Sequence, residues 1–284
     1  IFVSTTAGIT RYSTKFEDQL FWETKPNPEV KTSSLNYKQT SGNSDLFLKT
    51  IFDIKSIKTH DITAGIDLIY HQFNTGTLNY NTKENTIEKD TSIGDRNIFS
   101  HEEVIFAEDK WQVSKKLLLN LGLSFNSITV KENAYQLLQP RLSGNYNFSK
   151  EFYFNMSYSR MQQNLQILPN NSVGLPVDIW IPVTDYLKPQ VSDQVTAGMG
   201  YFFKKQYKLS VETYFKAMQN LVELKEGSFF VFGGYEWDKS FYTGKGNAKG
   251  LEIMLEKQSG KLRVWLSYTL SKADREFAGI NEGR

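Results

Sequence analysis

The sequence has no cysteine in its 284 residues and only three histidines. Without cysteine the chain can form no disulfide framework and carry out no thiol chemistry. His60, His71 and His101 lie far apart, and no spacing of His, Asp or Glu matches a zinc site. We also find no Ser-His-Asp arrangement and no paired carboxylates in distinguishable surroundings. The sequence therefore predicts no catalytic residue, no metal ligand and no cofactor, and we expect that the protein is not an enzyme.

Long apolar runs and a strong charge of one sign are missing too. No segment approaches the roughly 18 consecutive apolar residues of a membrane helix. The formal net charge is only +2, so the chain lacks the basic footprint of a nucleic-acid-binding protein. The mean hydropathy is −0.45. That value is compatible with a membrane barrel, because polar lumen-facing side chains and polar loops lower the mean hydropathy that the lipid-facing side chains would otherwise give.

What the sequence does contain is a two-residue alternation of apolar and polar side chains. In KLRVWLSYTLSKAD, residues 261–274, the apolar side chains fall at every second position. This period indicates a strand with one apolar and one polar surrounding, which a membrane barrel provides as lipid and lumen. The side chains expected to face lipid in this and a second strand are Leu119, Leu121, Val264 and Leu266, and those expected to face inward are Asn120 and Ser267.

Eleven segments of this kind recur, most of them about as long as the 9–11 residues that cross a bilayer at a tilt. We place them near residues 1–12, 45–55, 61–72, 101–113, 117–128, 140–148, 151–160, 193–204, 207–218, 249–257 and 261–272. Short and long connections alternate between them. The long connections are expected at residues 13–44, 73–100, 129–139, 161–192 and 219–248. Such parity is typical of outer-membrane barrels, which have short periplasmic turns and long external loops.

The predicted fold class is therefore all-β, a transmembrane antiparallel up-and-down β-barrel. Single-chain bacterial barrels close with an even number of strands, and an open sheet would leave bare edges in the hydrocarbon layer. Ile1 is not an initiator Met and the chain stops in a loop-like GINEGR, so we expect residues 1–284 to be a fragment of a larger barrel. In one segment Glu108 and Asp109 stand side by side, so one charge must face the apolar side or the strand must bulge.

Four stretches carry a resemblance to a known family. They are FAEDKWQVSKKLLLNLGLSF (106–125), QPRLSGNYNFSKEFYFNMSYSRMQQ (139–163), LPVDIWIPVTDYLKPQVSDQVTAGMGYFF (175–203) and GKGNAKGLEIMLEKQSGKLRVWLSYTLSKADREF (244–277). In order and spacing they resemble the barrel of TonB-dependent outer-membrane receptors of the Bacteroidetes type. Residues 1–99 contain none of these four stretches and resemble the family only in their general pattern.

The resemblance implies a barrel of about twenty-two strands in the outer membrane, closed around an N-terminal plug domain with a TonB-box segment. The plug domain and the C-terminal strands are not in this chain. The implied partners are outer-membrane lipid, the TonB energy complex acting through the missing N-terminal part, and a small nutrient such as a siderophore, a glycan, a peptide or a cobalamin. The sequence does not identify the nutrient.

Aromatic side chains in the long external connections are the best candidates for ligand contact. Trp beside Asp would suit a sugar, a peptide or a chelate, through stacking combined with hydrogen bonding. The predicted ligand-binding residues are Trp180, Asp178, Tyr235 and Trp237. The alternative is that these residues pack the loops or belong to the aromatic girdle. The glycines of GKGNAKG (244–250) precede a strand rather than a helix, so we do not interpret them as a phosphate-binding loop.

These observations predict an outer-membrane active transporter that binds a scarce nutrient at its external loops and imports it with TonB-coupled energy. Two alternatives stay open. The first is a passive porin or another outer-membrane barrel, including an enzyme on a smaller barrel, which would show a complete and even set of strands. The second is a soluble all-β ligand-binding module, whose loops need not alternate in length.

Overall fold

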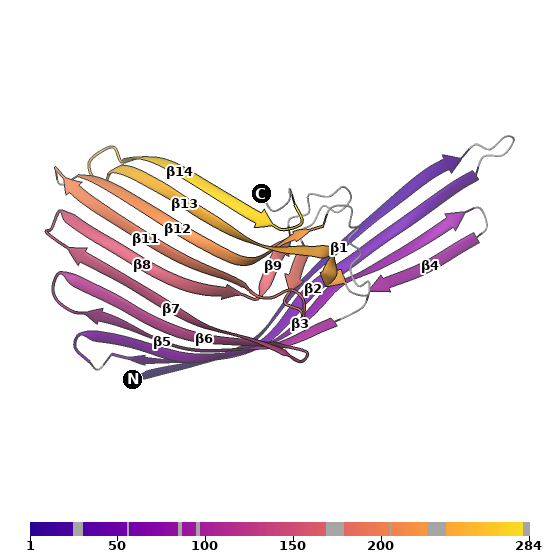
Figure 1. The fold of residues 1–284 in the computed structure, drawn as a ribbon, viewed down its shortest axis with the longest axis horizontal. Coiled ribbons are helices and arrows are strands. Elements are labelled where there is room, and N and C mark those ends of the chain that lie inside the picture. The colour runs from indigo at the N-terminus through magenta and orange to yellow at the C-terminus, as the bar shows by residue number, and fades with distance from the viewer. Residues whose placement is uncertain are drawn as a thin grey trace.

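The computed structural model describes residues 1–24, 31–55, 57–84, 87–94, 97–168, 179–204, 206–225 and 237–280. Within these residues the chain forms one large antiparallel sheet of twelve strands and one small sheet of two strands. Figure 1 shows the large sheet as a curved wall in which chain neighbours lie side by side. No helix in the described parts of the chain is long and apolar enough to cross a membrane.

Eleven strands of the large sheet follow one another in the order of the sequence. They are β1 (Phe2–Thr24), β2 (Lys31–Ile54), β3 (His60–Glu84), β5 (Asn97–Gln112), β6 (Leu117–Val130), β7 (Asn133–Asn147), β8 (Phe152–Gln163), β11 (Gln190–Phe203), β12 (Tyr207–Leu224), β13 (Phe241–Lys257) and β14 (Val264–Phe277). Each matches one of the eleven strands expected from the sequence. The predicted all-β antiparallel up-and-down fold is therefore confirmed in its strand order and pairing.

Four short elements lie off this path. The twelfth strand, β4 (Ile87–Gly94), pairs with the far end of β3. The small sheet is a pair formed by β9 (Leu165–Leu168) and β10 (Ile179–Pro182), and a single 3-10 turn, η1 (Trp237–Ser240), precedes β13. In Figure 1, β1, β2, β3 and β4 extend to the right well beyond the ends of the later strands.

The two faces of the wall differ in chemistry, as the alternation predicts. Leu121 pairs with Leu142 across β6 and β7, and both side chains are exposed on one face. Asn120 lies on the opposite face, where its amide donates to the hydroxyl of Ser143 at 3.0 Å. In β14, Leu266 pairs with Leu255 on the first face and Ser267 pairs with Met254 on the second. The predicted alternation of these side chains is confirmed.

The polar face is the inner one, because the small sheet and its flanking residues are packed on it. Ile128 and Val130 lie on the same face as Asn120, since each is an even number of residues away along β6. Both side chains are buried against Val183, just after β10. The leucine-rich face is correspondingly the outer wall.

The predicted loop lengths are wrong for three connections. Residues 13–44 and 73–100 were expected to be loops, but β1 extends to Thr24, β2 begins at Lys31 and β3 extends to Glu84. Residues 129–139 are also not a loop, because β6 and β7 join through a two-residue turn at 131–132. The strands continue past the residues in which apolar and polar side chains alternate, so the pattern that marks a strand in the sequence is missing from these extensions.

The ambiguity at Glu108 and Asp109 is resolved without a bulge. The register of β5 is continuous through both residues on its β3 and β6 sides. Asp109 faces outward with Ile62 and Leu121 as its direct neighbours. Its Oδ2 atom lies 2.7 Å from His60 Nδ1, and the His60 ring stacks on Trp111 at a centroid distance of 5.4 Å. A polar partner therefore compensates the outward carboxylate.

We predict that Leu123→Arg in the full-length receptor lowers the amount of folded barrel in the outer membrane. Leu123 is on the outer wall and 48% exposed, and an arginine on the lipid face near the bilayer midplane costs about 2–4 kcal/mol. The matched control is Ser124→Arg, which places the same charge on the inner face. Heat-modifiable gel mobility of membrane fractions measures the folded fraction. Equal folded amounts for the two variants would contradict the assignment of faces.

Candidate ligand vestibule

A segment between β10 and β11 is held against the strands by two apolar clusters. Val183 packs on Ile128 and Val130, with Ile98 and Tyr135 at the edge of this cluster. Four residues later, the fully buried Leu187 packs on Val222 and Phe241. The segment therefore joins the far ends of β6 and β7 to those of β12 and β13.

Hydrogen bonds at Thr184 fix the turn between the two clusters. The Thr184 hydroxyl accepts the backbone N–H groups of Tyr186 at 3.2 Å and Leu187 at 3.0 Å. It donates to Asp238 Oδ2 at 2.7 Å, and the Thr184 carbonyl accepts the Tyr135 hydroxyl at 3.0 Å. Thr184 thus ties its own turn to η1 through its hydroxyl and to β7 through its backbone carbonyl.

Asp185 adds an electrostatic tie to the turn between β6 and β7. Its carboxylate accepts the amide of Asn133 and the ammonium group of Lys131, each at 3.0 Å. The hydrogen bond from Asn133 and that from Lys131 lower the pKa of Asp185 below its ordinary value. The contact is partly exposed, so we expect salt to weaken it.

A hydrogen-bonded network crosses the inner face beside this segment. His71 Nδ1 lies 2.9 Å from Asp45, and His71 Nε2 lies 3.1 Å from Glu102. Asn126 donates to the second oxygen of Glu102 at 2.6 Å, and Gln162 donates to Asn126 at 3.2 Å. Both ring nitrogens of a histidine donate only in the imidazolium form. The geometry therefore fits one positive ring held between two carboxylates.

A second polar depression, of about 260 Å³, lies on the inner face closer to the short turns. Lys49 and Asp67 pair across it at 3.6 Å, and Glu108 and Arg141 are also among its lining residues. The second oxygen of Asp67 is buried with no hydrogen-bond partner among the described residues. The inner face therefore carries charges of both signs and unused hydrogen-bonding capacity.

The aromatic residues predicted to bind a ligand have different surroundings. Trp180 lies on β10, and its ring meets the Tyr12 ring of β1 edge-on at a centroid distance of 6.2 Å. Trp237 lies in η1 and packs on the buried cluster, 6.1 Å from Phe241. Asp178 and Tyr235 lie outside the described residues. Trp180 and Trp237 belong to different parts of the structure, and Trp237 also has a packing role.

Sequence reasoning missed the network of Asp45, His71 and Glu102. These three residues come from three strands and are far apart in the sequence, so no spacing connects them. Only the register does so, because Asp45 pairs directly with His71 and Glu102 lies diagonally across from it. Among the described residues, no group of three or more His, Asp or Glu side chains is placed to hold a metal ion. The network can orient a polar ligand or another part of the protein by hydrogen bonding.

The glycine-rich stretch 244–250 has a packing role in the structure. A side chain at Gly250 would collide with the Tyr214 ring, and one at Gly244 would collide with Phe277. The glycines let aromatic rings lie flat on the inner face of β13. This agrees with their interpretation as strand residues rather than as a phosphate-binding loop.

The model of the family described as "TonB dependent receptor-like, beta-barrel" matches residues 3–284. The chain belongs to this TonB-dependent receptor barrel family. None of the curated proteins compared with it matches the chain. Barrels of this family reside in the bacterial outer membrane, and TonB-dependent receptors are transporters rather than enzymes. The predicted fold class and location are thereby confirmed.

Solved structures of other receptors share the fold. The chain is similar to the FrpB iron transporter from Neisseria meningitidis (F5-1 variant), with 10% identity, a TM-score of 0.62, and coverage of 96% of this chain and 46% of that chain. The RagAB peptide transporter gives 10% identity and a TM-score of 0.59 over 99% of this chain and 35% of that chain. The siderophore receptor PirA from Pseudomonas aeruginosa gives 10% identity and a TM-score of 0.54 over 95% of this chain and 52% of that chain. This TonB-dependent receptor barrel chain spans about half or less of these structures.

We predict that Asp238→Ala loosens the turn at residues 183–187, whereas Asp238→Asn largely preserves it. The alanine removes the acceptor of the Thr184 hydroxyl, and a hydrogen bond to a charged group contributes about 1.5–3 kcal/mol. Amide hydrogen exchange at Tyr186 and Leu187 should therefore rise by roughly tenfold or more in Asp238→Ala. Exchange measured by mass spectrometry on the full-length receptor in detergent tests this. Unchanged protection in the alanine variant would show that the apolar clusters alone hold the turn.

Proposed function

We propose that this chain is the central part of the barrel of an active importer for a scarce nutrient. The single observation that carries the proposal is the family match over residues 3–284. In this proposal the nutrient binds among the external loops and a plug domain, and the TonB energy complex then acts on the plug. The substrate is a small molecule such as a siderophore, a glycan or a peptide, and the Bacteroidetes type of the receptor rests on the sequence motifs alone.

The proposal also assigns all of residues 1–284 to one barrel domain of about twenty-two strands in total. Support comes from the eleven consecutive strands, which form an open wall in the described residues with β1 and β14 at its two edges. Almost every residue of β14 is exposed, which is the state of a strand whose next neighbour lies outside this chain. The paired charges and unused polar atoms on the inner face suit contact with a plug domain.

The external ends of the strands are the proposed place of nutrient capture. The segment between β8 and β11 covers part of the inner face and carries Trp180. We propose Trp180, Asp178, Tyr235 and Trp237 as ligand-binding residues, with Trp180 as the strongest of the four. Its partner, Tyr12, comes from β1, so the two rings together offer an aromatic corner to a ligand entering the barrel.

The decisive experiment compares a strain lacking the full-length receptor with its parent on limiting ferric chelates, glycans or peptides as the only source of iron or carbon. An active importer produces a growth defect on one of these classes, and loss of the TonB energy complex produces the same defect. Growth that needs the receptor but not the TonB complex would instead favour a passive porin. Equal growth of both strains on every class would oppose a role in the uptake of these nutrients.

We predict that Trp180→Ala lowers nutrient uptake at limiting concentration by about tenfold without reducing receptor abundance. The physical reason is the loss of one aromatic contact surface in a ligand site. Trp237→Ala should lower uptake and also loosen the cluster around Phe241. The control is Trp265→Ala, an exposed tryptophan of β14 near the short turn that precedes it. Uptake unchanged in both loop variants would show that these tryptophans only pack the loops.

We predict that single cysteines label according to the end of the barrel on which they lie. The short turns containing Lys115, Lys150 and Gly260 should face the periplasm, and the turn containing Lys131 should face the outside. The native chain lacks cysteine, so Lys131→Cys should react with an impermeant maleimide on whole cells and Lys115→Cys should not. Labelling of Lys115→Cys alone would invert the proposed topology.

A further inference from the structure

The short turns at one end of the barrel concentrate basic side chains. These five turns join β2 to β3, β5 to β6, β7 to β8, β11 to β12 and β13 to β14. Among their described residues, one is acidic, Glu151, and eight are basic. The basic residues are Lys55, Lys58, Lys115, Lys116, Lys150, Lys204, Lys261 and Arg263. Since the whole chain has a net charge of only +2, the short turns are strongly positive and the rest of the chain is negative.

The charges of the short turns are not balanced within the chain. All eight basic side chains are exposed, and none of them forms an ion pair with a carboxylate among the described residues. Elsewhere, by contrast, Lys49 pairs with Asp67 and Lys131 pairs with Asp185. Successive short turns are about 10 Å apart, because each is two strands from the next, and this is close to the Debye length at physiological salt. The turns therefore repel one another, and an anionic partner would stabilise this end of the barrel.

Aromatic rings of the outer wall lie next to the short turns. Phe148 packs on Tyr146 and Phe152, with ring centroids 4.7 and 5.2 Å away. At the neighbouring hairpin, Phe203 stacks on Tyr207 at a centroid distance of 5.3 Å. Tyr146, Phe152 and Tyr207 continue the outward-facing rows of the sheet. Since aromatic girdles of this kind lie at the level of the lipid head groups, the adjoining turns lie at that level too.

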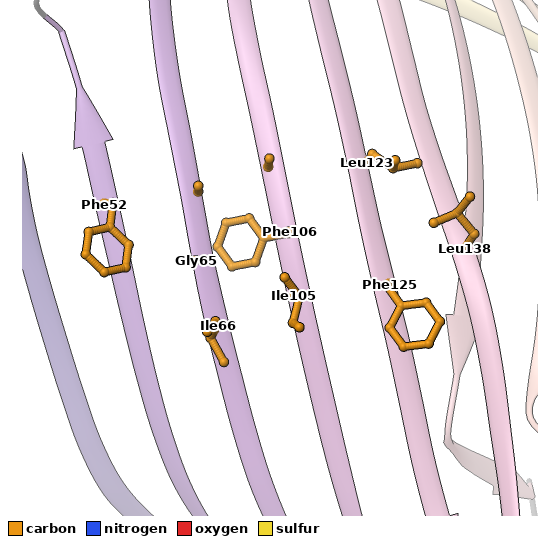
Figure 2. A pocket seen from close by; sticks show the side chains of 10 residues that line it. Phe52, Gly65, Ile66, Ile105, Phe106, Leu123, Phe125 and Leu138 are labelled. Carbon is orange, nitrogen blue, oxygen red and sulfur yellow. The ribbon is translucent and has the colours of Figure 1, made fainter.

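The wall that adjoins this girdle is apolar and faces lipid. In Figure 2, Phe52, Ile105 and Leu123 lie on β2, β5 and β6 and line a depression with mostly apolar surroundings. All three side chains are exposed. Acyl chains cover such a wall in an outer-membrane barrel, so the head groups of the same lipids lie beside the short turns.

We propose that the short turns bind the phosphate groups of anionic phospholipids, such as phosphatidylglycerol, in the leaflet on their side of the membrane. Lys150 follows Phe148 by two residues and Lys204 follows Phe203 directly, so each apolar stem can lie along the girdle while the ammonium group stays among the head groups. Lys116 extends toward the same girdle, because its Nζ donates to the Phe148 carbonyl at 3.2 Å.

The preference for an anionic lipid follows from charge. A zwitterionic head group carries its own cation, which offsets its phosphate, whereas phosphatidylglycerol has a net negative charge that complements the turns. The proposed topology enters only in naming the leaflet, which is the periplasmic one. The inference is otherwise independent of the transported nutrient, because it concerns the surface that faces lipid.

The test uses the full-length receptor in phosphatidylcholine vesicles that contain trace phosphatidylglycerol or phosphatidylcholine with the same photoreactive acyl chain. Mass spectrometry of peptic peptides measures cross-linking at the strand ends beside each short turn. We expect phosphatidylglycerol to label these ends about threefold to fivefold more than phosphatidylcholine, the effect of roughly one basic group on one anionic lipid. About 1 M NaCl should remove most of this preference, because it shortens the Debye length to about 3 Å. Both leaflets have the same composition, so the result does not depend on the topology or on nutrient uptake.

Neutral variants test whether the turn lysines cause the preference. Lys58→Gln combined with Lys115→Gln removes two exposed charges from adjacent turns, which are joined by the hydrogen bond from the Gln112 N–H to the Thr59 carbonyl at 2.8 Å. Labelling by phosphatidylglycerol beside these two turns should fall about threefold to fivefold, toward the level of phosphatidylcholine. Labelling beside the turn at 258–263 should persist in the same molecules and serves as an internal control.

The matched control variant combines Lys15→Gln with Lys38→Gln. It removes the same charge from the parts of β1 and β2 that extend beyond the later strands (Figure 1), and it should keep the labelling of the wild type. Equal labelling by the two lipids at low salt, unchanged labelling in the turn variant, or the same loss in the control variant would each overturn the proposal.

Discussion

The structure depends on one constraint: a strand inside the hydrocarbon layer must give every backbone N–H and C=O group to a neighbouring strand. This requirement produces the unbroken run of antiparallel pairs from β1 to β14. It also fixes the alternation of the two faces, because a register shift of one residue would move every apolar side chain from lipid to lumen. The register tolerates an irregularity only where a strand has left the bilayer or approaches its surface. Within β2 it lies between Thr40 and Gly42, and within β12 between Gln219 and Leu221.

The same pairing brings distant parts of the sequence together on the inner face. The residues of the histidine network, Asp45, His71 and Glu102, become neighbours only because β2, β3 and β5 are adjacent and in register. Among the described residues, the middle of the outer wall has no comparable network, because mostly apolar side chains contact lipid there. Ion pairs on this wall lie near the ends of strands, and its middle also contains an uncharged contact, between the Thr5 and Thr50 hydroxyls at 3.2 Å. Asp109 with His60 lies at one end, and Asp193, held by Arg160 and Tyr158, lies toward the other.

The sequence predicted the strands whose side chains face lipid, and it missed the strand extensions and the turn that lack this pattern. All eleven spanning strands could be located, because lipid selects for alternate apolar side chains and therefore leaves a period of two. β1, β2 and β3 run many residues further than their apolar alternation, so no period of two predicts their ends. The turn at 131–132 was missed for the same reason. Residues 129–139 contain polar side chains that are typical of loops, but most of these residues pair as strands, and Val130 and Gln139 are buried.

The candidate vestibule was only partly predictable, since it depends on contacts between connections rather than on local patterns. Trp180 and Trp237 look equivalent in the sequence, each flanked by aspartate. In the structure, Trp237 contributes to a buried cluster, and its neighbour Asp238 is engaged by Thr184. An aspartate next to a loop tryptophan therefore does not by itself indicate ligand binding, because the carboxylate can instead be bound by another part of the protein. Trp180 differs because its ring meets Tyr12 on a strand that the sequence separates from it by more than half the chain.

The tie between the external connections has a mechanical consequence for any transport through the barrel. Val183 and Leu187 anchor one segment to two distant pairs of strands, and Thr184 and Asp185 add polar links to η1 and to the turn at 131–132. A displacement of one connection must therefore strain the others, since packed clusters shift as units rather than deforming smoothly. A ligand that moves the segment carrying Trp180 can in this way alter the ends of β6, β7, β12 and β13 together. Such a change would reach a domain that fills the barrel through the inner face rather than through the lipid-facing wall.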